Sequence, residues 1–466
     1  MVSFSILDLS IIIVFFAVVL LIGFLPGMQD KSGEGFLLSG RKVGLFLFIL
    51  TNVSTWYGGI LGVGEFTYRY GLLSWFTQGL PYYIFAIIFA LLFAKKIRSA
   101  SLFTIPDKLE EIYGRQAGVI SSVLVFILVS PAPYLLMVGS LLSLIFNIPL
   151  LPSLVVAVLV SVSYLFRSGY KSYLYTDAFQ FFVMFIGFFV IVYAAYTNLG
   201  GVDYLVHNLP ADHLKLTGGA SPAYIIVWFL IALWTFADPG FHQRCYAAKT
   251  GKIAATGIII SVFFWALFDF LTTSTGLFAR ASIPNMSNPV LAFPLFAEKI
   301  LGSGYKGIFY AALFATIIST LNSFMFLSAT TFGRDFIYKL KRSNDDTLLA
   351  KYTRWGLLVS SIVSIILAFS IDSVIEIWYS IGSICIPGII LPIFGAYFEK
   401  FRISSKLIVI EICAGVLSSL LWLVMRPYIG TSGILSEIEP MIAGLVVSLL
   451  IHIYGLLTKP KPNVSV

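Results

Sequence analysis

Residues 51–65 read T-N-V-S-T-W-Y-G-G-I-L-G-V-G-E, and they lie inside a run that is otherwise apolar enough to cross a membrane. Four glycines and several hydroxyl or amide side chains fall within this one stretch. Glycine lowers the cost of non-helical backbone angles, so we expect the helix to unwind here. Lipid forbids unwound backbone unless the freed carbonyls line a cavity inside the protein. The stretch therefore predicts a broken transmembrane helix beside a cavity.

A second stretch, W-T-F-A-D-P-G-F-H-Q-R at residues 234–244, carries the same signal. Asp238, Pro239 and Gly240 fall together there, and proline removes a backbone donor while clashing with the preceding turn. The two candidate breaks lie five spans apart, so they cross the membrane in opposite directions. That spacing is typical of an inverted five-helix repeat, with spans 2–6 set against spans 7–11. The alternative is that each glycine cluster only allows close helix packing.

The composition requires a membrane. Of 466 residues, 59% are hydrophobic and only 11% are charged, where a soluble domain carries about 25%, and the mean hydropathy is +0.95. The uncharged runs are about 17–25 residues long, which fits helices and not barrel strands. We therefore predict an all-α polytopic membrane protein whose main partner is the lipid bilayer. The first run, Leu9 to Leu25, has no small-residue cleavage site after it and is interpreted as a retained helix.

Hydropathy predicts thirteen transmembrane spans in one domain, 1–466. They lie at about 6–25, 44–63, 71–94, 118–145, 150–166, 172–198, 222–243, 253–279, 305–331, 354–370, 373–394, 405–425 and 439–457. The first repeat would cover about 44–198 and the second about 222–394, with extra helices at about 6–25, 405–425 and 439–457.

The basic residues orient the chain. With the amino terminus outside, 24 of the 30 Lys and Arg residues fall on the cytoplasmic side and six on the other. This bias predicts a protein of the plasma (inner) membrane with a cytoplasmic carboxyl terminus. It also explains the net charge of +8 without nucleic acid. The three cysteines and four histidines have no disulfide or metal spacing, and neither paired carboxylates nor a nucleophile with a base occur in the spans. We expect no enzyme and no obligatory protein partner.

A polar stripe runs along one predicted helix, A-T-I-I-S-T-L-N-S at residues 315–323. Successive helical residues are rotated by about 100°, so four hydroxyls share one face and an amide lies at its edge. Those residues are Thr316, Ser319, Thr320 and Ser323, with Asn322 at the edge. A small hard cation prefers such oxygens. The alternatives are close helix approach and hydrogen bonds back to the preceding turn.

Asp177 lies in Y-L-Y-T-D-A-F-Q, near the cytoplasmic end of span 6. A carboxylate inside a membrane costs several kcal/mol unless it is paired or used. It therefore strengthens the prediction of a cation site, although an ordinary interfacial charge remains the alternative.

With these residues in hand, the chain resembles the sodium:solute symporter family over about residues 5–455. The motifs are S-T-W-Y-G-G (54–59), Y-R-Y-G-L (68–72), T-D-A-F-Q (176–180), Q-R-C-Y-A-A-K (243–249), A-A-L-F-A-T-I-I-S-T-L-N-S (311–323) and F-G-R-D (332–335). The order and spacing of the motifs carry the resemblance, since none is decisive alone. It implies the leucine-transporter-type fold with inverted repeats, and transport of a small organic solute with Na⁺.

The resemblance also implies ion sites. The main sodium would be held by carbonyls of Val53 and Trp56, the carbonyl of Thr316, and the hydroxyls of Ser319 and Thr320. The family often has alanine where Thr316 stands, and the register along 51–65 can be shifted by several residues. A possible second sodium would be held by Asp177, Ser319, Asn322 and Ser323. Serine is the usual residue at position 322, but an amide oxygen is an adequate substitute.

Family positions that line the solute cavity correspond to Ser54, Trp56, Gly58, Gln78, Trp234, Phe236 and Asp238. Aromatic residues at such positions also serve as packing or thin gates. Asp238 could bind a cationic or polyhydroxyl solute or take a proton, or it could simply cap the helix at Pro239. Glu65 is interpreted as an entrance or solvated residue, and Arg244 and Lys249 as charges of the inner surface.

The implied mechanism is sodium symport by alternating access, in which sodium orders the broken span 2 against span 9 and completes the solute cavity. Spans 2, 3, 7 and 8 would then rock against the rest. A proton-coupled or ion-independent transporter of the same fold is the alternative, with Asp177 or Asp238 titrating. A membrane sensor or a channel fits less well, because the polar stripe is local. The sequence does not identify the solute.

Overall fold

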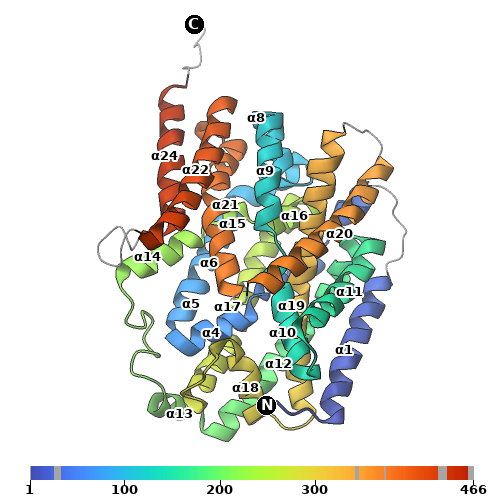
Figure 1. Ribbon diagram of the computed structural model, residues 1–466, viewed down its shortest axis with the longest axis vertical. Helices are drawn as coiled ribbons and strands as arrows, with labels where there is room; N and C mark the ends of the chain where they lie inside the picture. The colour runs from blue at the N-terminus through green and yellow to red at the C-terminus, as the bar shows by residue number, and fades with distance from the viewer. Residues whose placement is uncertain (1, 26–32, 342–345, 372–373, 429–437, 460–466) are drawn as a thin grey trace.

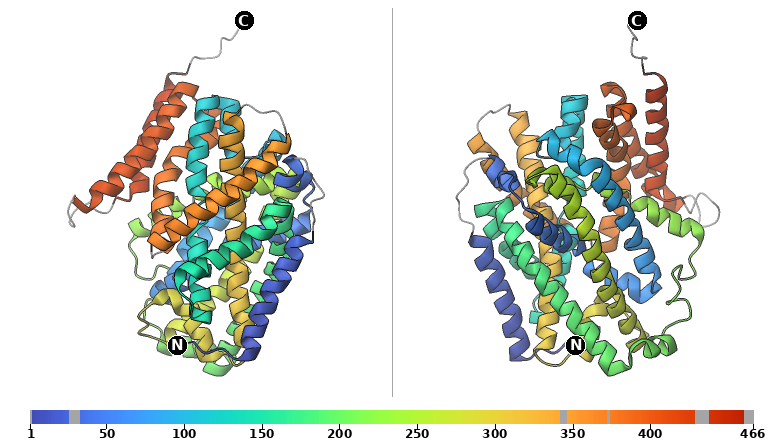
Figure 2. Two further views of the ribbon diagram at one scale, coloured as in Figure 1. Left: turned by 45° about the vertical axis from the view of Figure 1, so that its right-hand side comes forward. Right: turned by 180° about the vertical axis from the view of Figure 1, so that it is seen from behind.

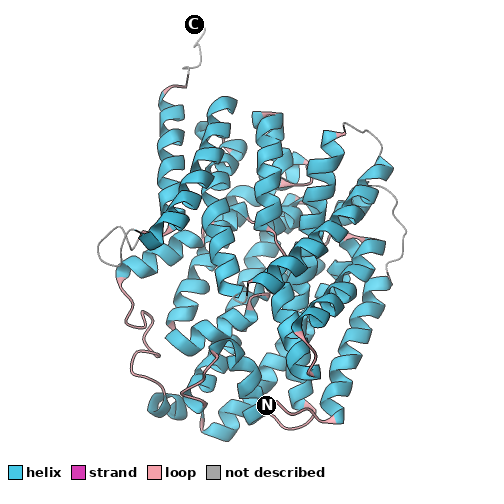
Figure 3. Cartoon of the chain, viewed as in Figure 1, coloured by secondary structure: helices cyan, strands magenta, loops and turns pink. Residues whose placement is uncertain are grey.

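The computed structural model describes residues 2–25, 33–341, 346–371, 374–428 and 438–459, and most of this part is helical (Figure 3). In the first half of the chain the elements are α1 (Ile6–Phe24), α2 (Gly33–Leu38), η1 (Ser39–Arg41), α3 (Leu45–Ser54), η2 (Thr55–Tyr57), α4 (Ile60–Tyr70), α5 (Leu73–Gln78), α6 (Leu80–Phe89), η3 (Ala90–Ala94), α7 (Lys95–Ala100), α8 (Ile105–Tyr113), α9 (Arg115–Leu128), α10 (Ala132–Phe146), α11 (Leu150–Ser168), α12 (Tyr170–Leu199) and α13 (Gly201–Asn208). The second half adds α14 (Pro222–Ile231), α15 (Trp234–Ala237), α16 (Pro239–Ala247), α17 (Gly251–Ser282), η4 (Pro289–Leu291), α18 (Ala292–Ile300), α19 (Tyr305–Thr330), η5 (Thr331–Tyr338), α20 (Asp346–Ser370), α21 (Val374–Tyr397), η6 (Glu399–Phe401), α22 (Ser405–Met425), η7 (Arg426–Tyr428) and α24 (Pro440–Leu457).

The number of membrane spans agrees with the sequence. Among the described residues, twelve helical segments are long and apolar enough to cross a membrane, and the bent pair α3 and α4 makes a thirteenth. The prediction of an all-α polytopic membrane protein with about thirteen spans is therefore confirmed.

The helix α19 forms the centre of the molecule. Within its most apolar window 89% of the residues are buried, whereas the corresponding share is 28% for both α1 and α22. Figures 1 and 2 show α19 surrounded by other helices, with α1 and α24 at opposite edges. Protein surrounds α19 on most sides, so its polar stripe faces other helices and not lipid.

The first predicted break is present. The helix α3 ends at Ser54, a single 3₁₀ turn covers Thr55–Tyr57, and α4 resumes at Ile60 after a bend of 56°. Gly58 lies directly against the side chain of Thr320 on α19, where an added Cβ would overlap it. The glycine thus permits the close approach of the two helices, because a larger residue would collide with Thr320.

The second predicted break is present as well. Span 7 is divided into α14, α15 and α16, and Asp238 between the last two has an extended backbone (φ −71°, ψ 114°). Pro239 begins α16, where its missing N–H costs nothing. The assignment of the two breaks to inverted repeats at about 44–198 and 222–394 stays a prediction.

The break within span 4 was not expected. The sequence predicts a continuous helix at about 118–145, but α9 ends at Leu128 and α10 begins at Ala132. The intervening segment contains Pro131, and Pro133 follows it in the first turn of α10. Proline disfavours the helical conformation of the residue before it, so two prolines this close together end one helix and start another.

Candidate functional site

Asp177 is the buried centre of a polar cluster that joins three helices. Its Oδ1 accepts a hydrogen bond from the Ser319 hydroxyl at 2.8 Å, and its Oδ2 lies 3.0 Å from the Thr55 hydroxyl. All three side chains are buried. They come from α12, α19 and the turn η2. The structure therefore brings Asp177 together with Ser319, as the sequence predicts, and adds Thr55 of the broken span.

Thr320 contacts the unwound backbone directly. Its hydroxyl donates to the Thr55 carbonyl at 2.7 Å. The Val53 carbonyl accepts from the Thr55 N–H within the tight turn. The Thr316 hydroxyl instead donates back to the Ala312 carbonyl at 2.6 Å, so this side chain serves its own helix. The sequence did not single out Thr55, although it lies within the opening stretch.

Asn322 and Ser323 leave oxygens without partners. The Asn322 amide nitrogen donates to the Tyr164 hydroxyl. Its Oδ1 and the Ser323 hydroxyl are buried, and neither has a hydrogen-bond partner among the described residues. Buried polar atoms that lack a partner cost free energy, so such atoms near a carboxylate are candidates for ion ligands.

Trp56 lies in an aromatic group beside the broken helix. It stacks on Trp265 with ring centroids 4.9 Å apart, and the edges of Tyr82 and Phe241 approach it at 5.2 and 5.6 Å. Trp56 and Tyr82 are half-buried, whereas Trp265 and Phe241 are buried. Asp238 adjoins this group, since its Oδ1 accepts from the N–H of Phe241. This group combines apolar ring faces with a carboxylate.

Asp238 caps a helix. Its Oδ1 accepts from the Phe241 N–H at 2.8 Å at the start of α16, and the residue is half-buried. The capping interpretation of the sequence is thus correct, and it accounts for one of the two carboxylate oxygens.

Of the other predicted solute residues, two are buried in packing contacts and two are only partly buried. Phe236 is buried among the rings of Phe85, Phe89, Phe93 and Phe394, and Ser54 is buried with its hydroxyl directed at the Thr51 carbonyl. These contacts are typical of packing. Trp234 is half-buried against Gly382, and Gln78 ends α5 with an amide nitrogen that has no partner among the described residues. Gln78 thus retains a free donor.

Two charged residues are more buried than the sequence predicts. Arg244 is 4% exposed, and its Nη2 donates to the Thr55 hydroxyl at 2.6 Å, so it is not an inner-surface charge. Glu65 is 8% exposed and paired with Arg69 at 2.9 Å, so it is not a solvated residue, and its place at the entrance stays a prediction. Long side chains reach across several ångströms, and hydropathy along the chain does not report the direction they take. Lys249 is exposed, as expected.

Asp269 was missed by the sequence interpretation. It is half-buried on α17, and its Oδ2 accepts from the Tyr83 hydroxyl. The Tyr57 hydroxyl from the broken span donates nearby, to the Trp265 carbonyl at 2.7 Å. Asp269 is the single charged residue between Lys252 and Arg280, and that isolation was the available signal.

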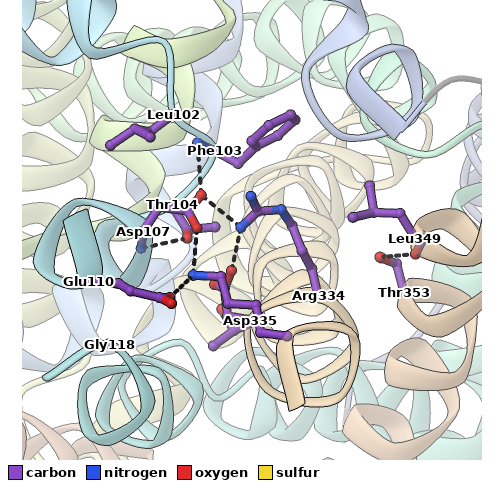
Figure 4. Close-up of polar contacts among 12 residues, drawn as sticks. Leu102, Phe103, Thr104, Asp107, Glu110, Gly118, Arg334, Asp335, Leu349 and Thr353 are labelled. Carbon is purple, nitrogen blue, oxygen red and sulfur yellow. Dashed lines mark hydrogen bonds and ion pairs between the residues drawn. The ribbon is translucent and has the colours of Figure 1, made fainter. Parts of the chain in front are cut away.

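Figure 4 shows an ionic cluster at the η5 end of α19. The Asp107 carboxylate of α8 lies 2.7 Å from both Arg334 and Lys339, and Arg334 also pairs with Asp335 at 2.6 Å. Burial alone would raise the pKa of Asp107, but the two cations outweigh it and hold that pKa well below its usual range. The cluster fastens α8 to the helix that carries the polar stripe.

Comparison with known proteins identifies the family of the chain. Residues 36–402 match the sodium:solute symporter family, which is more than half of the chain. The chain belongs to the sodium:solute symporter family. This symporter is therefore a multi-pass membrane transporter that couples a small solute to sodium, and it is not an enzyme.

Its relatives carry different solutes. The symporter is 26% identical over 415 residues to the high-affinity choline transporter 1 of Caenorhabditis elegans, a match that covers 80% of this chain and 71% of the relative. It is also 26% identical over 417 residues to the sodium/glucose cotransporter of Vibrio parahaemolyticus, covering 78% and 75%. The fold matches a Na⁺-coupled sialic acid symporter solved with substrate in an outward-open state, with a TM-score of 0.84 at 17% identity over 98% of both chains. This match confirms the leucine-transporter-type fold.

Proposed function

We propose that this symporter imports a small organic solute across the plasma membrane by alternating access, with its amino terminus outside and its carboxyl terminus in the cytoplasm. The observation that carries the proposal is the contact between the broken span 2 and α19. There the Thr320 hydroxyl donates to the Thr55 carbonyl, and the Ser319 hydroxyl lies 3.4 Å from the Thr55 hydroxyl, beside the bend. An ion bound at this junction would hold the two helices together, and its release would let them part.

The main sodium site is proposed at this junction. Its ligands would be the hydroxyls of Ser319 and Thr320 with backbone carbonyls of Val53, Trp56 and Thr316. Neutral oxygens bind a monovalent cation without trapping it, which suits an ion that must be released inside. The contact of Thr320 with the Thr55 carbonyl supports the site and suggests that this carbonyl belongs to the same ligand set.

A second sodium is proposed around Asp177. Ser319 already contacts this carboxylate, and the unpartnered oxygens of Asn322 and Ser323 would complete the set. The carboxylate makes this the more strongly charged of the two sites.

The solute would bind between the two breaks. Trp56, Gln78, Trp234 and Asp238 offer ring faces, an amide donor and a carboxylate oxygen not engaged by the helix cap. Gly58 would support this cavity indirectly, by letting the broken helix pack against Thr320. Such a set suits a solute that is cationic or rich in hydroxyls, which are the chemistries of the choline and glucose that name two relatives. Phe236 and Ser54 would support the walls by packing.

Proton coupling is the second candidate function, and Asp269 is the observation that favours it. Its carboxylate contacts a tyrosine hydroxyl, and it forms no ion pair with any described residue. A proton-coupled carrier would take up solute without sodium, and the substitution Asp269→Asn would abolish the pH dependence of that uptake. Sodium-dependent uptake that survives this substitution would exclude proton coupling through Asp269.

The proposed sodium site is tested by a thermal-shift screen of the purified symporter. Amino acids, sugars, carboxylates and quaternary amines would be added in NaCl or in KCl. We expect sodium alone to raise the melting temperature, and the right solute to raise it further only with sodium. If sodium stabilised nothing, alone or with any ligand, the proposed site would be wrong.

Substitution of the two hydroxyls gives the sharper test. We expect Ser319→Ala with Thr320→Ala to weaken sodium binding by at least about tenfold, because two oxygen ligands are lost. Ser328→Ala is the matched control, since Ser328 lies on the same helix and bonds to Ser360 at 2.9 Å, away from the junction. The sodium affinity of the double variant and of the control is measured by following the melting temperature as sodium is titrated. An unchanged titration in the double variant would contradict the assignment.

A further inference from the structure

Arg244 is a buried cation that points into the proposed ion sites. It belongs to α16, the half of span 7 that follows the break at Asp238. Only 4% of the residue is exposed, and its Nη2 donates to the Thr55 hydroxyl at 2.6 Å. The guanidinium thus reaches from one broken span to the other.

The contact continues to Asp177. The same Thr55 oxygen lies 3.0 Å from the Asp177 Oδ2, while Ser319 holds the Oδ1. This single hydroxyl thus links the Arg244 guanidinium to the Asp177 carboxylate. Among the described residues, no Lys, Arg or His forms a direct ion pair with Asp177. Arg244 is therefore the internal countercharge of this carboxylate.

The other carboxylate near Arg244 is already satisfied. Asp238 accepts a backbone N–H at the start of α16, where a helix amino terminus favours negative charge. A Cβ added to Gly240 would lie 2.9 Å from the Arg244 Nη1 and 3.0 Å from the Asp238 Oδ1, so the two groups flank this glycine. Asp177 has no such helix terminus and depends on a cation.

A transporter must return empty to bind its next solute. During that return a bare carboxylate at membrane depth would be costly, because it has lost both water and its ion. A guanidinium on a tether can neutralise the carboxylate in the empty protein and withdraw when an ion arrives.

We propose that Arg244 acts as a tethered cation that occupies the Asp177 site whenever no second sodium is bound. This inference rests on the proposed function and adds a competitor to its second ion site. Sodium binds at Asp177 by displacing the guanidinium from Thr55. Arg244 therefore sets how much sodium the second site requires, and it allows the empty protein to return.

The test uses the purified full-length symporter and sodium alone. Melting temperature and tryptophan fluorescence are followed as NaCl replaces KCl at constant ionic strength. We expect Arg244→Gln to lower the sodium concentration for half-maximal response by about five- to tenfold, because the competitor is removed. Arg244→Lys, which keeps the charge, should stay closer to the wild type. Lys249→Gln is the matched control, since it removes an exposed cation five residues away, and it should not shift the titration.

The variant Arg244→Gln with Asp177→Asn covers the case in which Arg244→Gln alone does not fold. Removing one partner of a buried pair is strongly destabilising, whereas removing both costs much less, so the double variant should fold and melt above either single variant. Its sodium titration should report binding at the main site alone. The Hill slope of that titration should therefore be lower than the slope for Arg244→Gln.

The outcomes separate the two proposals. If the wild type does not respond to sodium, the proposed function fails and the inference fails with it. If the wild type responds but Arg244→Gln titrates like the wild type or needs more sodium, only the inference is overturned. Lack of stability rescue in the double variant would also overturn it, because Arg244 and Asp177 would then not be a pair.

Discussion

At the scale of single residues, Gly58 decides how closely the broken helix approaches α19. Its backbone angles (φ −54°, ψ −25°) are open to any residue, so the need for glycine comes from space alone. The Thr320 side chain fills the volume that a Cβ would take. A residue larger than glycine must separate the two helices between which the main sodium site is proposed.

We expect Gly58→Ala to destabilise the symporter by about 1–3 kcal/mol, the usual cost of overpacking, and to weaken sodium binding. Gly44 gives a control, because nothing lies within 4 Å of an added Cβ there. Gly44→Ala should leave both properties unchanged. Melting temperatures with and without sodium measure the difference, and equal behaviour of the two variants would contradict this steric explanation.

At the scale of elements, the ionic cluster joins α8 to η5. Asp107 is buried between Arg334 and Lys339, while the neighbouring pair Lys108–Glu111 has its glutamate 49% exposed. Breaking a buried ion pair and breaking an exposed one cost different amounts of stability, because only the groups of the buried pair have lost their contact with water.

We expect Asp107→Asn to cost about 3 kcal/mol at neutral pH, because Lys339 and Arg334 lose a buried partner. Glu111→Gln should cost less than about 1 kcal/mol. Measured melting temperatures in matched buffer would rank the two variants, and equal losses would contradict the importance of burial.

The pH dependence follows from the lowered pKa of Asp107. A carboxyl group with a depressed pKa in the folded protein contributes stability above its unfolded pKa of about 3.9 and loses it as the pH falls towards the folded value. The wild type should therefore lose stability more steeply than Asp107→Asn between about pH 5 and pH 3. If the stability of the wild type and of Asp107→Asn fell in parallel as the pH fell, Asp107 would not be the source of this pH dependence.

At the scale of the whole molecule, the proposed orientation in the membrane rests on the distribution of Lys and Arg. We expect a cysteine at Ser3 to react with an impermeant maleimide in intact cells, and one at Lys459 to react only after permeabilisation. Both positions are exposed. Cys245 and Cys385 are buried and can stay, whereas Cys413 would be replaced. A gel shift records the labelling, and the opposite pattern would reverse the proposed topology.

The sequence by itself determined the number of spans and the two breaks at residues 51–65 and 234–244. Long uncharged runs must become helices in lipid, and glycine or proline inside such a run must interrupt them. These are local properties, so residues 51–65 and 234–244 were sufficient. The resemblance then supplied the family, which the match over residues 36–402 confirms.

Only the tertiary structure decided where the long and charged side chains go. Arg244 lies near the end of a span, which is typical of a surface charge, yet it folds inward to Thr55. Phe236 lies beside a break but packs into an aromatic core, and Asp269 finds Tyr83 on another helix. A linear sequence gives the depth of a residue in the membrane, but it gives neither the direction in which the side chain leaves the helix axis nor how far that side chain extends. Those two quantities determine which groups meet.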